Sequence, residues 1–434
     1  MKHPHKVPYL VCSDEEGNLF EDESLQVAAR VGNSIIALKP TDFIELPFGS
    51  DMFNLPGRIP LGIDPLTGEV KQSDMGYASA AFVAPAHTQT HLAAWVTEPG
   101  APTLPLYAYT ALGWLDGKFY TTAVRVDPDR RQDCDQFNQN AVERSAKREL
   151  KANKTNRLLE HIAHCATVYI CPAARNYFLN RWEAPLPTSP TCNSQCLGCI
   201  SYQPKEHPIT STQNRITFVP TPEEIAEIAT GHFAIAPNPI VSFGQGCEGE
   251  PILQWKTIKE SIILMRKATT KGVINLNSNA SLPNAVDELC KAGLDSLRVS
   301  MNSAREPLYN AYYKPRNYTF SDVKESMRIA RRNGIWVSIN YFVFPGITDT
   351  EAEFDALCNL ISDCKINMIQ WRNFNIDPEW FFHNVEVPNG GSAMGVKVFM
   401  DRIRQKFPHM YHGYFNPGRE IIEEYLPLVK SLDA

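Results

Sequence analysis

Residues 191–201 read TCNSQCLGCIS, a run that places Cys192, Cys196 and Cys199 at the spacing C-x3-C-x2-C. No fourth cysteine follows nearby in the sequence. Three thiolates can hold three irons of a [4Fe–4S] cube and leave the fourth iron open. An iron with an open position can bind a substrate or a cofactor. The spacing therefore predicts a metal centre with one free coordination position near the middle of the chain.

Zinc offers a second interpretation of the same three cysteines. Structural zinc sites are usually closed and four-coordinate, so this interpretation needs one more ligand, from Cys171, His164 or Cys165. These belong to a looser group upstream of the motif that also contains Cys134 and His161. His161 and Cys165 are four residues apart and would share one face of a helix. An auxiliary metal site in this group stays open, although its spacing matches no tight ligand pattern.

A glycine-rich run, GQGCEGEPIL at residues 244–253, follows a predicted strand with the sequence PIVSF. Gly246 and Gly249 let a ligand approach the backbone closely, because glycine has no side chain. Glu250 can accept hydrogen bonds from an ammonium group. Cys247, in the same run, is interpreted as a small packed thiol rather than as a ligand.

From about residue 180 the sequence alternates between predicted strands and helices, which favours a parallel sheet with right-handed crossovers. The strands mix apolar and polar residues: Leu297 and Val299 alternate with Arg298 and Ser300. Side chains alternate across a strand, so each such strand has one polar face. Four strands share the pattern, at residues 273–279, 296–302, 335–344 and 367–374. Polar faces fit a sheet that curves around a cavity; solvent-exposed edges are the alternative.

The order and spacing of these motifs resemble the radical S-adenosylmethionine (radical SAM) superfamily. The glycine-rich run is similar to that family's GGE motif, whose glutamate-bearing loop contacts the methionyl amino group of the cofactor. SNA (278–280), LRVSMNSA (297–304) and FVFPGITD (342–349) resemble the ends of its third, fourth and fifth strands. The resemblance covers about residues 185–377.

Site residues follow from this resemblance. It implies that Cys192, Cys196 and Cys199 bind the metal. It implies that the cofactor is bound by Gly246, Gly249, Glu250, Ser278, Asn279, Ser300 and Asn302. One position departs from the family, where the residue before the third cysteine is commonly aromatic and packs the adenine. Here it is Gly198, so we expect Leu197 or Tyr202 to supply that contact, or the cofactor to sit slightly differently.

The resemblance also implies a fold and an activity. The fold is α/β, a partial (β/α)6 TIM-like barrel with an N-terminal accessory domain. The activity is reductive cleavage of S-adenosylmethionine by a [4Fe–4S] cluster. The resulting 5′-deoxyadenosyl radical would abstract hydrogen from a substrate. A reductant such as flavodoxin or ferredoxin is implied as a partner.

The run WRNFNIDPEWFFH, at residues 371–383, follows the last predicted strand and is dense in polar and aromatic side chains. Active sites of barrel folds lie at this end of the strands. Arg372 is a candidate for binding a carboxylate or phosphate. Asp377 is the second candidate catalytic residue. A purely structural Arg–Asp pair that closes the barrel is the alternative.

The 434 residues are enough for two domains. We expect residues 1–179 to form the accessory domain, β-rich over 1–126 and helical over 127–179. Residues 180–434 would form the core barrel with a C-terminal extension. The pair Asp116-Gly117 between apolar runs predicts a β-hairpin. The role of the accessory domain and the oligomeric state stay open.

Charge and apolar content bear on partners. The net charge is −6 and no basic run is present. A small molecule or peptide is therefore favoured over nucleic acid as substrate. The sequence lacks a signal-peptide-like start and any apolar run long enough to cross a membrane. We expect a cytoplasmic protein with reduced thiols and no membrane partner.

Two other functions stay open. One is a non-catalytic iron–sulfur or zinc-binding protein that retains the barrel, which Gly198 and Cys247 would favour. The other is an activating enzyme that acts on a partner protein. The sequence identifies neither the substrate nor the product.

Overall fold

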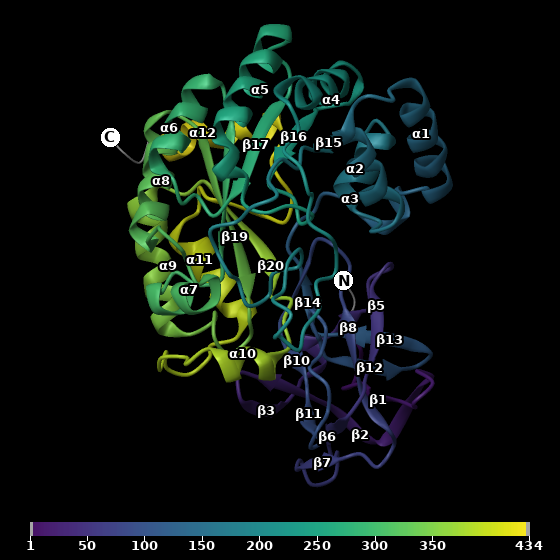
Figure 1. Cartoon of the computed structure of the whole chain (residues 1–434). Helices are drawn as coiled ribbons and strands as arrows, with labels where there is room; N and C mark the ends of the chain where they lie inside the picture. The colour runs from purple at the N-terminus through teal and green to yellow at the C-terminus, as the bar shows by residue number, and fades with distance from the viewer. Residues whose placement is uncertain (1–2, 431–434) are drawn as a thin grey trace.

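The structure is a computed structural model that describes residues 3–430. Its centre is a seven-stranded parallel sheet whose strands follow one another in chain order and curl into a half-barrel (Figure 1). The strands are β15 (Glu183–Pro185), β16 (Ile240–Phe243), β17 (Val273–Ser278), β18 (Ser296–Met301), β19 (Trp336–Val343), β20 (Met368–Asn373) and β21 (Tyr411–Gly413). The predicted partial barrel is confirmed.

Helices connect these strands and cover the outer face of the sheet (Figure 1). They are α4 (Pro222–Ile235), α5 (Trp255–Ala268), α6 (Pro283–Ala292), α7 (Glu306–Tyr313), α8 (Phe320–Arg332), α9 (Glu351–Cys364), α10 (Pro378–Asn384), α11 (Val396–Lys406) and α12 (Arg419–Lys430). A short 3₁₀ helix, Pro251–Gln254, precedes α5.

Capping residues set where two of these helices begin. Thr221 accepts a hydrogen bond from the Glu224 backbone N–H, and the Glu224 side chain accepts one from the Thr221 backbone N–H, so a capping box opens α4. Helix α8 has an equivalent box between Thr319 and Asp322. The sequence suggests Ser321 as the start of α8, but Thr319 is the cap because its hydroxyl reaches the Asp322 N–H.

The N-terminal part of the chain forms antiparallel sheets, as expected for a β-rich region. Twelve strands make one sheet: β1 (Tyr9–Ser13), β2 (Leu19–Val31), β3 (Ser34–Ala37), β4 (Ile44–Glu45), β5 (Asp51–Leu55), β6 (Arg58–Ile63), β7 (Val70–Gln72), β8 (Tyr77–Phe82), β10 (Leu92–Ala93), β11 (Trp95–Thr97), β12 (Leu112–Leu115) and β13 (Lys118–Thr121). Strands β9 (His87–Gln89) and β14 (Ala123–Arg125) form a separate pair. Asp116 and Gly117 both have positive φ and turn β12 into β13, which confirms the predicted hairpin.

Three helices follow the antiparallel sheets: α1 (Gln139–Ala152), α2 (Arg157–Thr167) and α3 (Pro172–Phe178). They lie beside α4 at the β15 edge of the barrel (Figure 1). The division of the chain into domains at residues 179/180 stays a prediction. Its outer ends, residues 1–2 and 431–434, lie outside the described residues.

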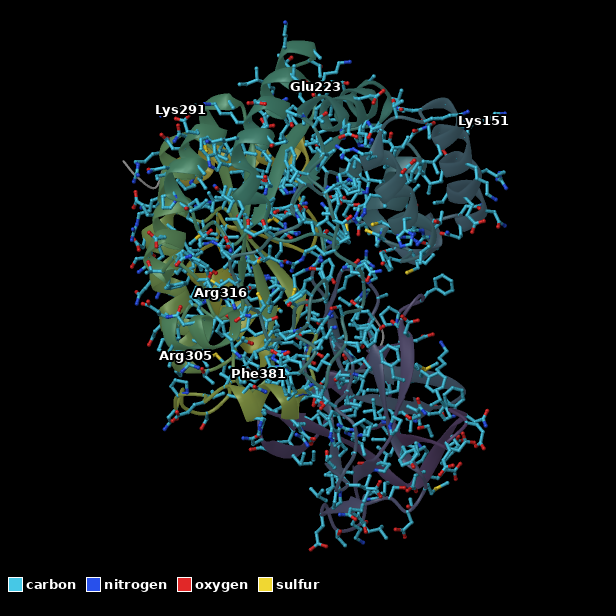
Figure 2. All side chains as sticks on the ribbon, in the orientation of Figure 1. Lys151, Glu223, Lys291, Arg305, Arg316 and Phe381 are labelled. Atoms are coloured by element: carbon cyan, nitrogen blue, oxygen red, sulfur yellow. The ribbon has the colours of Figure 1, made fainter. Side chains whose placement is uncertain are left out.

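Hydrogen bonds join the N-terminal strands to the carboxyl ends of the barrel strands. The Thr88 hydroxyl on β9 donates to the Trp371 carbonyl over 2.9 Å. The Gln89 backbone N–H donates to Asn373 Oδ1 over 2.8 Å. Phe381 on α10 is buried near this junction, whereas Lys151 and Glu223 point outward on the far helices (Figure 2). The N-terminal strands therefore cover the end of the barrel where its strands terminate.

None of the helices within residues 3–430 is both long and apolar enough to cross a membrane.

Candidate active site in the barrel

A cavity of about 370 Å³ opens where the parallel strands end. This volume lies in the range of small-molecule sites. Its wall contains cysteines, glycines, polar strand residues and aromatic rings. The lining includes Phe82, Cys196, Gly198, Cys199, Gly246, Gly249, Glu250, Asn277, Ser278, Arg298, Ser300, Tyr312, Asn340, Phe342, Arg372 and Phe374. The polar strand faces therefore do surround a cavity, as the alternation predicts.

The cysteine loop is held against the end of α7 by backbone hydrogen bonds. The Gln195 and Leu197 N–H groups donate to the Tyr313 and Tyr312 carbonyls, each over 3.0 Å. The Cys199 N–H donates to the Cys196 carbonyl over 3.2 Å. These bonds turn the loop so that Cys196 and Cys199 line the cavity.

The three thiols are half-buried. Burial raises the pKa of Cys192 to about 11, and the nearby Glu250 carboxylate adds to the rise. Burial also raises the pKa of Cys196, and Cys199 and Cys192 each add to it. The three groups therefore lie close enough to sense one another's charge. A metal ion replaces the proton on a thiol, so thiols that are protonated without the ion become thiolates when it binds.

A buried carboxylate, Glu248, ties the glycine-rich loop to the chain that enters the cysteine motif. One of its oxygens accepts from the Gly244 and Gln245 N–H groups over 2.8 and 2.7 Å. The other accepts from the Thr188 and Ser189 N–H groups over 2.7 and 2.9 Å. Glu248 is not among the residues predicted from the sequence to form the site. Its position two residues before Glu250 could have identified it, because the backbone N–H groups of a glycine-rich loop need acceptors.

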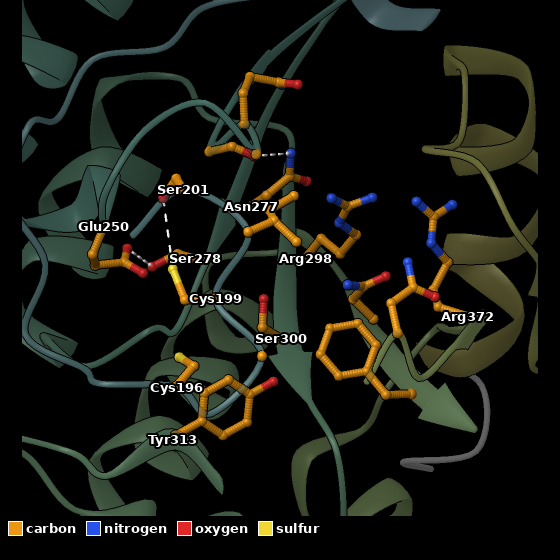
Figure 3. Close-up of a pocket in the computed structure, with 18 of the residues that line it drawn as sticks. Cys196, Cys199, Ser201, Glu250, Asn277, Ser278, Arg298, Ser300, Tyr313 and Arg372 are labelled. Carbon is orange, nitrogen blue, oxygen red and sulfur yellow. Dashed lines mark hydrogen bonds between the residues drawn. The ribbon is translucent and has the colours of Figure 1, made fainter. Parts of the chain in front are cut away.

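Glu250 caps the 3₁₀ helix and faces the cavity (Figure 3). Its Oε1 accepts from the Ser278 hydroxyl over 2.5 Å and from the Ile252 N–H over 3.0 Å. Its Oε2 accepts from the Asn279 N–H over 2.8 Å. An ionised carboxylate has about four acceptor sites, so about one stays free for a ligand. Burial raises the pKa of Glu250 to about 7, against the effect of these hydrogen bonds.

Packing within the protein requires glycine at position 249, whereas Gly246 meets only the ends of side chains that can move. A Cβ on Gly249 would overlap the Thr191 carbonyl, and one on Gly246 would overlap the Gln213 side chain. From the sequence, both glycines are expected to let a ligand approach the backbone closely. Both line the cavity, but their tightest neighbours are other parts of the chain.

Two arginines line the cavity on the side away from Cys196 and Glu250 (Figure 3). Arg298, in the middle of β18, donates to Gln370 Oε1 over 3.0 Å. Arg372, near the end of β20, donates to the Tyr414 carbonyl over 2.9 Å and stacks on the Tyr414 ring. The prediction that Arg372 faces a cavity agrees with this position, whereas Arg298 has no assigned role in the sequence analysis.

Neither arginine forms an ion pair with a carboxylate among residues 3–430. Nε of Arg298 is buried and has no hydrogen-bond partner among the described residues. Burial, reinforced by the neighbouring Arg372 charge, lowers the pKa of Arg298 to about 9. Glu183 lines an adjoining cavity that also contains Arg298 and Arg372, and its charge acts on Arg298, but its hydrogen bonds come from Ser242 and Asn416. Two adjacent cations that form no direct ion pair among the described residues can bind an anion.

Aromatic rings form the apolar part of the wall. Phe342 and Phe374 stack with centroids 5.8 Å apart, and Tyr312 meets Phe374 edge-on at 4.9 Å. The Tyr312 hydroxyl lies 2.9 Å from where a Cβ on Gly198 would be. Tyr312 therefore fills the space beside Gly198.

The two residues expected to compensate for Gly198 lie elsewhere. Leu197 is fully buried in the core, and Tyr202 is exposed and packs against Arg215. Neither lines the cavity. Helix α7 supplies a ring beside Gly198 in their place, and the remaining alternative, a slightly different position of the cofactor, stays a prediction.

Asp377 and Asn302 differ most from their predicted roles. Asp377 caps α10 and pairs with Arg58, and it does not line the cavity. Its carboxylate is used between the N-terminal sheet and the barrel, which gives it a structural use, and its catalytic role stays a prediction. It is a structural pair, with Arg58 rather than Arg372 as the partner. Asn302 donates to the Leu308 carbonyl over 3.2 Å and also lies behind the cavity wall.

Of the remaining predicted positions, Ser278 and Asn279 contact Glu250. Ser278 and Ser300 line the cavity. The Asn279 side chain donates to Asn193 Oδ1 over 2.8 Å and so contacts the cysteine loop. Ser278 and Asn279 therefore position Glu250 and the loop, while Ser300 is free to meet a ligand.

The comparisons with known proteins assign a family to part of the chain. Residues 186–358 match the family model described as the Radical SAM superfamily. No curated protein sequence is detectably similar to the chain.

Solved structures give only distant likenesses. One is Streptococcus suis SuiB bound to S-adenosylmethionine, at 14% identity and a TM-score of 0.37, covering 64% of this chain and 63% of that one. Another is the FeFe-hydrogenase maturase HydG from Carboxydothermus hydrogenoformans, at 12% identity and a TM-score of 0.38, covering 67% and 74%. The chain spans 52% of another SuiB structure. The family assignment rests on the family model.

Proposed function

We propose that the chain is a radical SAM enzyme, since its residues 186–358 match the Radical SAM superfamily model, and that it forms a 5′-deoxyadenosyl radical which abstracts hydrogen from an anionic substrate. One observation carries the proposal. A single cavity is lined by Cys196 and Cys199, by Glu250 and by the two arginines Arg298 and Arg372. Metal ligands, an acceptor for an ammonium group and an anion site thus meet in one volume.

The three thiols fit an iron–sulfur cluster. Cys192, Cys196 and Cys199 are the soft ligands that iron–sulfur clusters require, and three of them leave one iron of a [4Fe–4S] cube for S-adenosylmethionine. When bound, the cluster supplies the electron that cleaves S-adenosylmethionine into methionine and the 5′-deoxyadenosyl radical. Arg215 lies with a guanidinium nitrogen 3.8 Å from Cys199 Sγ and offsets thiolate charge. A flavodoxin or ferredoxin is the proposed reductant.

The chain's other residues orient the cofactor and exclude water. Glu250 accepts from the cofactor's ammonium group at its remaining acceptor site, with Ser278 and Asn279 fixing the carboxylate. The rings of Tyr312, Phe342 and Phe374 form an apolar wall that fits a purine. Such a wall also keeps water from a reactive radical.

The arginines define the substrate class. Arg298 and Arg372 lie across the cavity from the cysteine loop, so they fit the substrate better than the cofactor (Figure 3). Guanidinium groups without counter-ions bind carboxylates and phosphates. We therefore assign the substrate a carboxylate or phosphate group, on a small molecule or a peptide.

Anaerobic reconstitution with iron and sulfide tests this function. With S-adenosylmethionine and a strong reductant, the protein is expected to release 5′-deoxyadenosine, measured by mass spectrometry. The triple variant Cys192→Ala/Cys196→Ala/Cys199→Ala should lose about four irons per chain and all of this product. The variant Cys290→Ala/Cys358→Ala, which changes two buried core thiols on α6 and α9, is the matched control and should retain both.

A second step tests the substrate class. Cell extract should raise 5′-deoxyadenosine formation, and the stimulating compound should be retained by an anion-exchange resin. A fully loaded protein that releases no 5′-deoxyadenosine under any condition would support the non-catalytic alternative. Stimulation found only in the protein fraction would support an activating enzyme.

A further inference from the structure

A second group of metal-ligating side chains lies outside the cavity, between α2 and the glycine-rich loop. His161 and Cys165 are on successive turns of α2 and share one face. Cys247 lies in the loop after β16, directly after Gly246. Two segments far apart in sequence therefore bring two thiols and an imidazole together.

The donor atoms of this group converge. The Nε2 of His161 and the Sγ atoms of Cys165 and Cys247 all lie within 4.8 Å of one another. The Cys165 Sγ lies 3.6 Å from His161 Nε2. In the described part of the chain, no other group of three His, Cys, Asp or Glu side chains is this compact. Zinc bonds of about 2.3 Å to sulfur and 2.0–2.1 Å to nitrogen give tetrahedral edges of about 3.5–3.8 Å.

The other residues of the upstream group do not join it directly. His164 packs edge-on against Tyr169. The Cys134 thiol contacts the Gly49 carbonyl, in the N-terminal sheet region. Cys171 lies beside the group: its backbone N–H donates to the Cys165 carbonyl over 3.0 Å, and its thiol is close enough to interact electrostatically with Cys165 and Cys247.

We propose that His161, Cys165 and Cys247 bind a single zinc ion, with Cys171 next in position for the fourth ligand. Zn²⁺ displaces one proton from each of the two thiols and binds the neutral imidazole, so two protons are released and the three-ligand site carries no net charge; a Cys171 thiolate as fourth ligand would release a third proton and give the site a charge of −1. A neutral site suits its surroundings, since both thiols are buried.

The compactness of the group distinguishes one ion from a cluster. A four-iron cube is larger than a single ion and holds its thiolates further apart, as for the wider triplet at Cys192, Cys196 and Cys199. A disulfide would explain two thiols but leaves the imidazole without a function. The Cys165 and Cys247 thiols are unpaired in the structure.

A zinc ion here would join α2 to the loop that carries Glu250. The Cys247 carbonyl already accepts from the Ile216 N–H over 2.8 Å, so the loop is fixed on its other side. The zinc site is therefore a structural support for the cofactor loop and is separate from the cavity that contains Cys196 and Cys199.

Metal analysis of anaerobically purified full-length protein tests the proposal. Wild type should contain about one zinc per chain in addition to about four irons. Cys165→Ser/Cys247→Ser should lose the zinc, at least fivefold, and retain the iron. Cys290→Ser/Cys358→Ser, with two buried thiols far from the group, is the control and should retain the zinc. Zinc-edge absorption spectroscopy of wild type should show at least two sulfur ligands and one nitrogen ligand.

Other results would overturn the zinc site. Unchanged zinc in the double variant would place the ion elsewhere. Iron near eight per chain that falls by half in the double variant would make the group a second iron–sulfur site. A Cys165–Cys247 disulfide in metal-free wild type, detected by peptide mapping, would make it a redox pair. If the double variant fails to fold, absorption spectroscopy of wild type still decides the ligands.

Discussion

Arg58 and Asp377 form a buried ion pair that joins the N-terminal sheet to the barrel. The guanidinium of Arg58, on β6, lies 3.4 Å from Asp377 Oδ2, at the start of α10. The two side chains are 2% and 1% exposed. The same carboxylate accepts from the Leu104 and Glu379 N–H groups, each over 2.8 Å. Asp377 is thus a junction between two parts of the chain that are distant in sequence.

Replacement of Asp377 should lower the free energy of unfolding and leave the proposed reaction in the cavity unchanged. Asp377→Ala leaves the Arg58 charge buried and unpaired, so we expect a loss of about 3–5 kcal/mol in the free energy of unfolding. Asp377→Asn retains an acceptor for the helix cap and should lose less. Anaerobic denaturant unfolding measures both. Asp401→Ala, which removes an exposed pair with Arg404, is the control and should lose less than about 1 kcal/mol.

Cofactor binding should depend on pH through Glu250. Its pKa is raised to about 7 by burial, and only the ionised form can accept from the cofactor's ammonium group with full charge. As pH falls below about 7, the affinity for S-adenosylmethionine should fall by about tenfold per pH unit. Anaerobic titration between pH 5.5 and 7.5 measures this dependence.

The variant Glu250→Gln provides the control for that titration. It keeps the shape and removes the titrating charge, so binding should be weaker by about 1.5–3 kcal/mol and nearly independent of pH below 7.5. Iron content should match wild type. A pH dependence equal to that of wild type in this variant would assign it to another group.

Loss of either cavity arginine should stop turnover of the substrate. Arg372→Ala and Arg298→Ala each remove half of the proposed anion site, so substrate-stimulated 5′-deoxyadenosine formation should fall by at least tenfold. Slow cleavage without substrate should continue, because it requires only the cluster and the cofactor. Arg328→Ala, on the outer face of α8 and paired with Asp363, is the matched control. Equal losses in coupled and uncoupled cleavage would move the arginines to the cofactor site.

Two glycine-to-alanine changes should have opposite effects. Gly249→Ala would force a Cβ into the Thr191 carbonyl, so we expect a loss of about 1–3 kcal/mol and a displaced cysteine loop. Gly231→Ala, on α4, meets nothing within 4 Å and should gain about 0.5–1 kcal/mol. Thermal unfolding and iron content distinguish the two. A neutral Gly249→Ala variant would contradict the tight packing of that loop.

The barrel could be predicted from local patterns, because strand–helix alternation and capping residues such as Thr221 act within one or two turns. The polar faces of the strands also predicted the cavity. Strand β21 was not foreseen, because three residues are too few to show a strand period. The twelve-stranded sheet was foreseen only as β-rich, since its pairings join distant segments.

The site was less predictable where it depends on tertiary contacts. Arg298 is one polar residue among several on its strand until the fold places it beside Arg372. Tyr312 lies more than a hundred residues from Gly198, so no local pattern links them. Asp377 follows the end of a barrel strand, which is where catalytic residues of such folds lie. Its ion pair with Arg58 depends on the tertiary fold, so no local pattern predicts it. Cys247 has the local sequence of a packed thiol, and only the fold places it next to Cys165 and His161.

Phe82, at the end of β8, contributes to the cavity wall although it belongs to the N-terminal sheet. The cysteine loop and part of the cavity wall are thus encoded in separate stretches of the gene. Mutations in the N-terminal stretch can reshape the wall at Phe82 and leave the cysteine loop untouched. Under the proposed function, selection could therefore change the shape of the substrate pocket while conserving the residues proposed to hold the cluster.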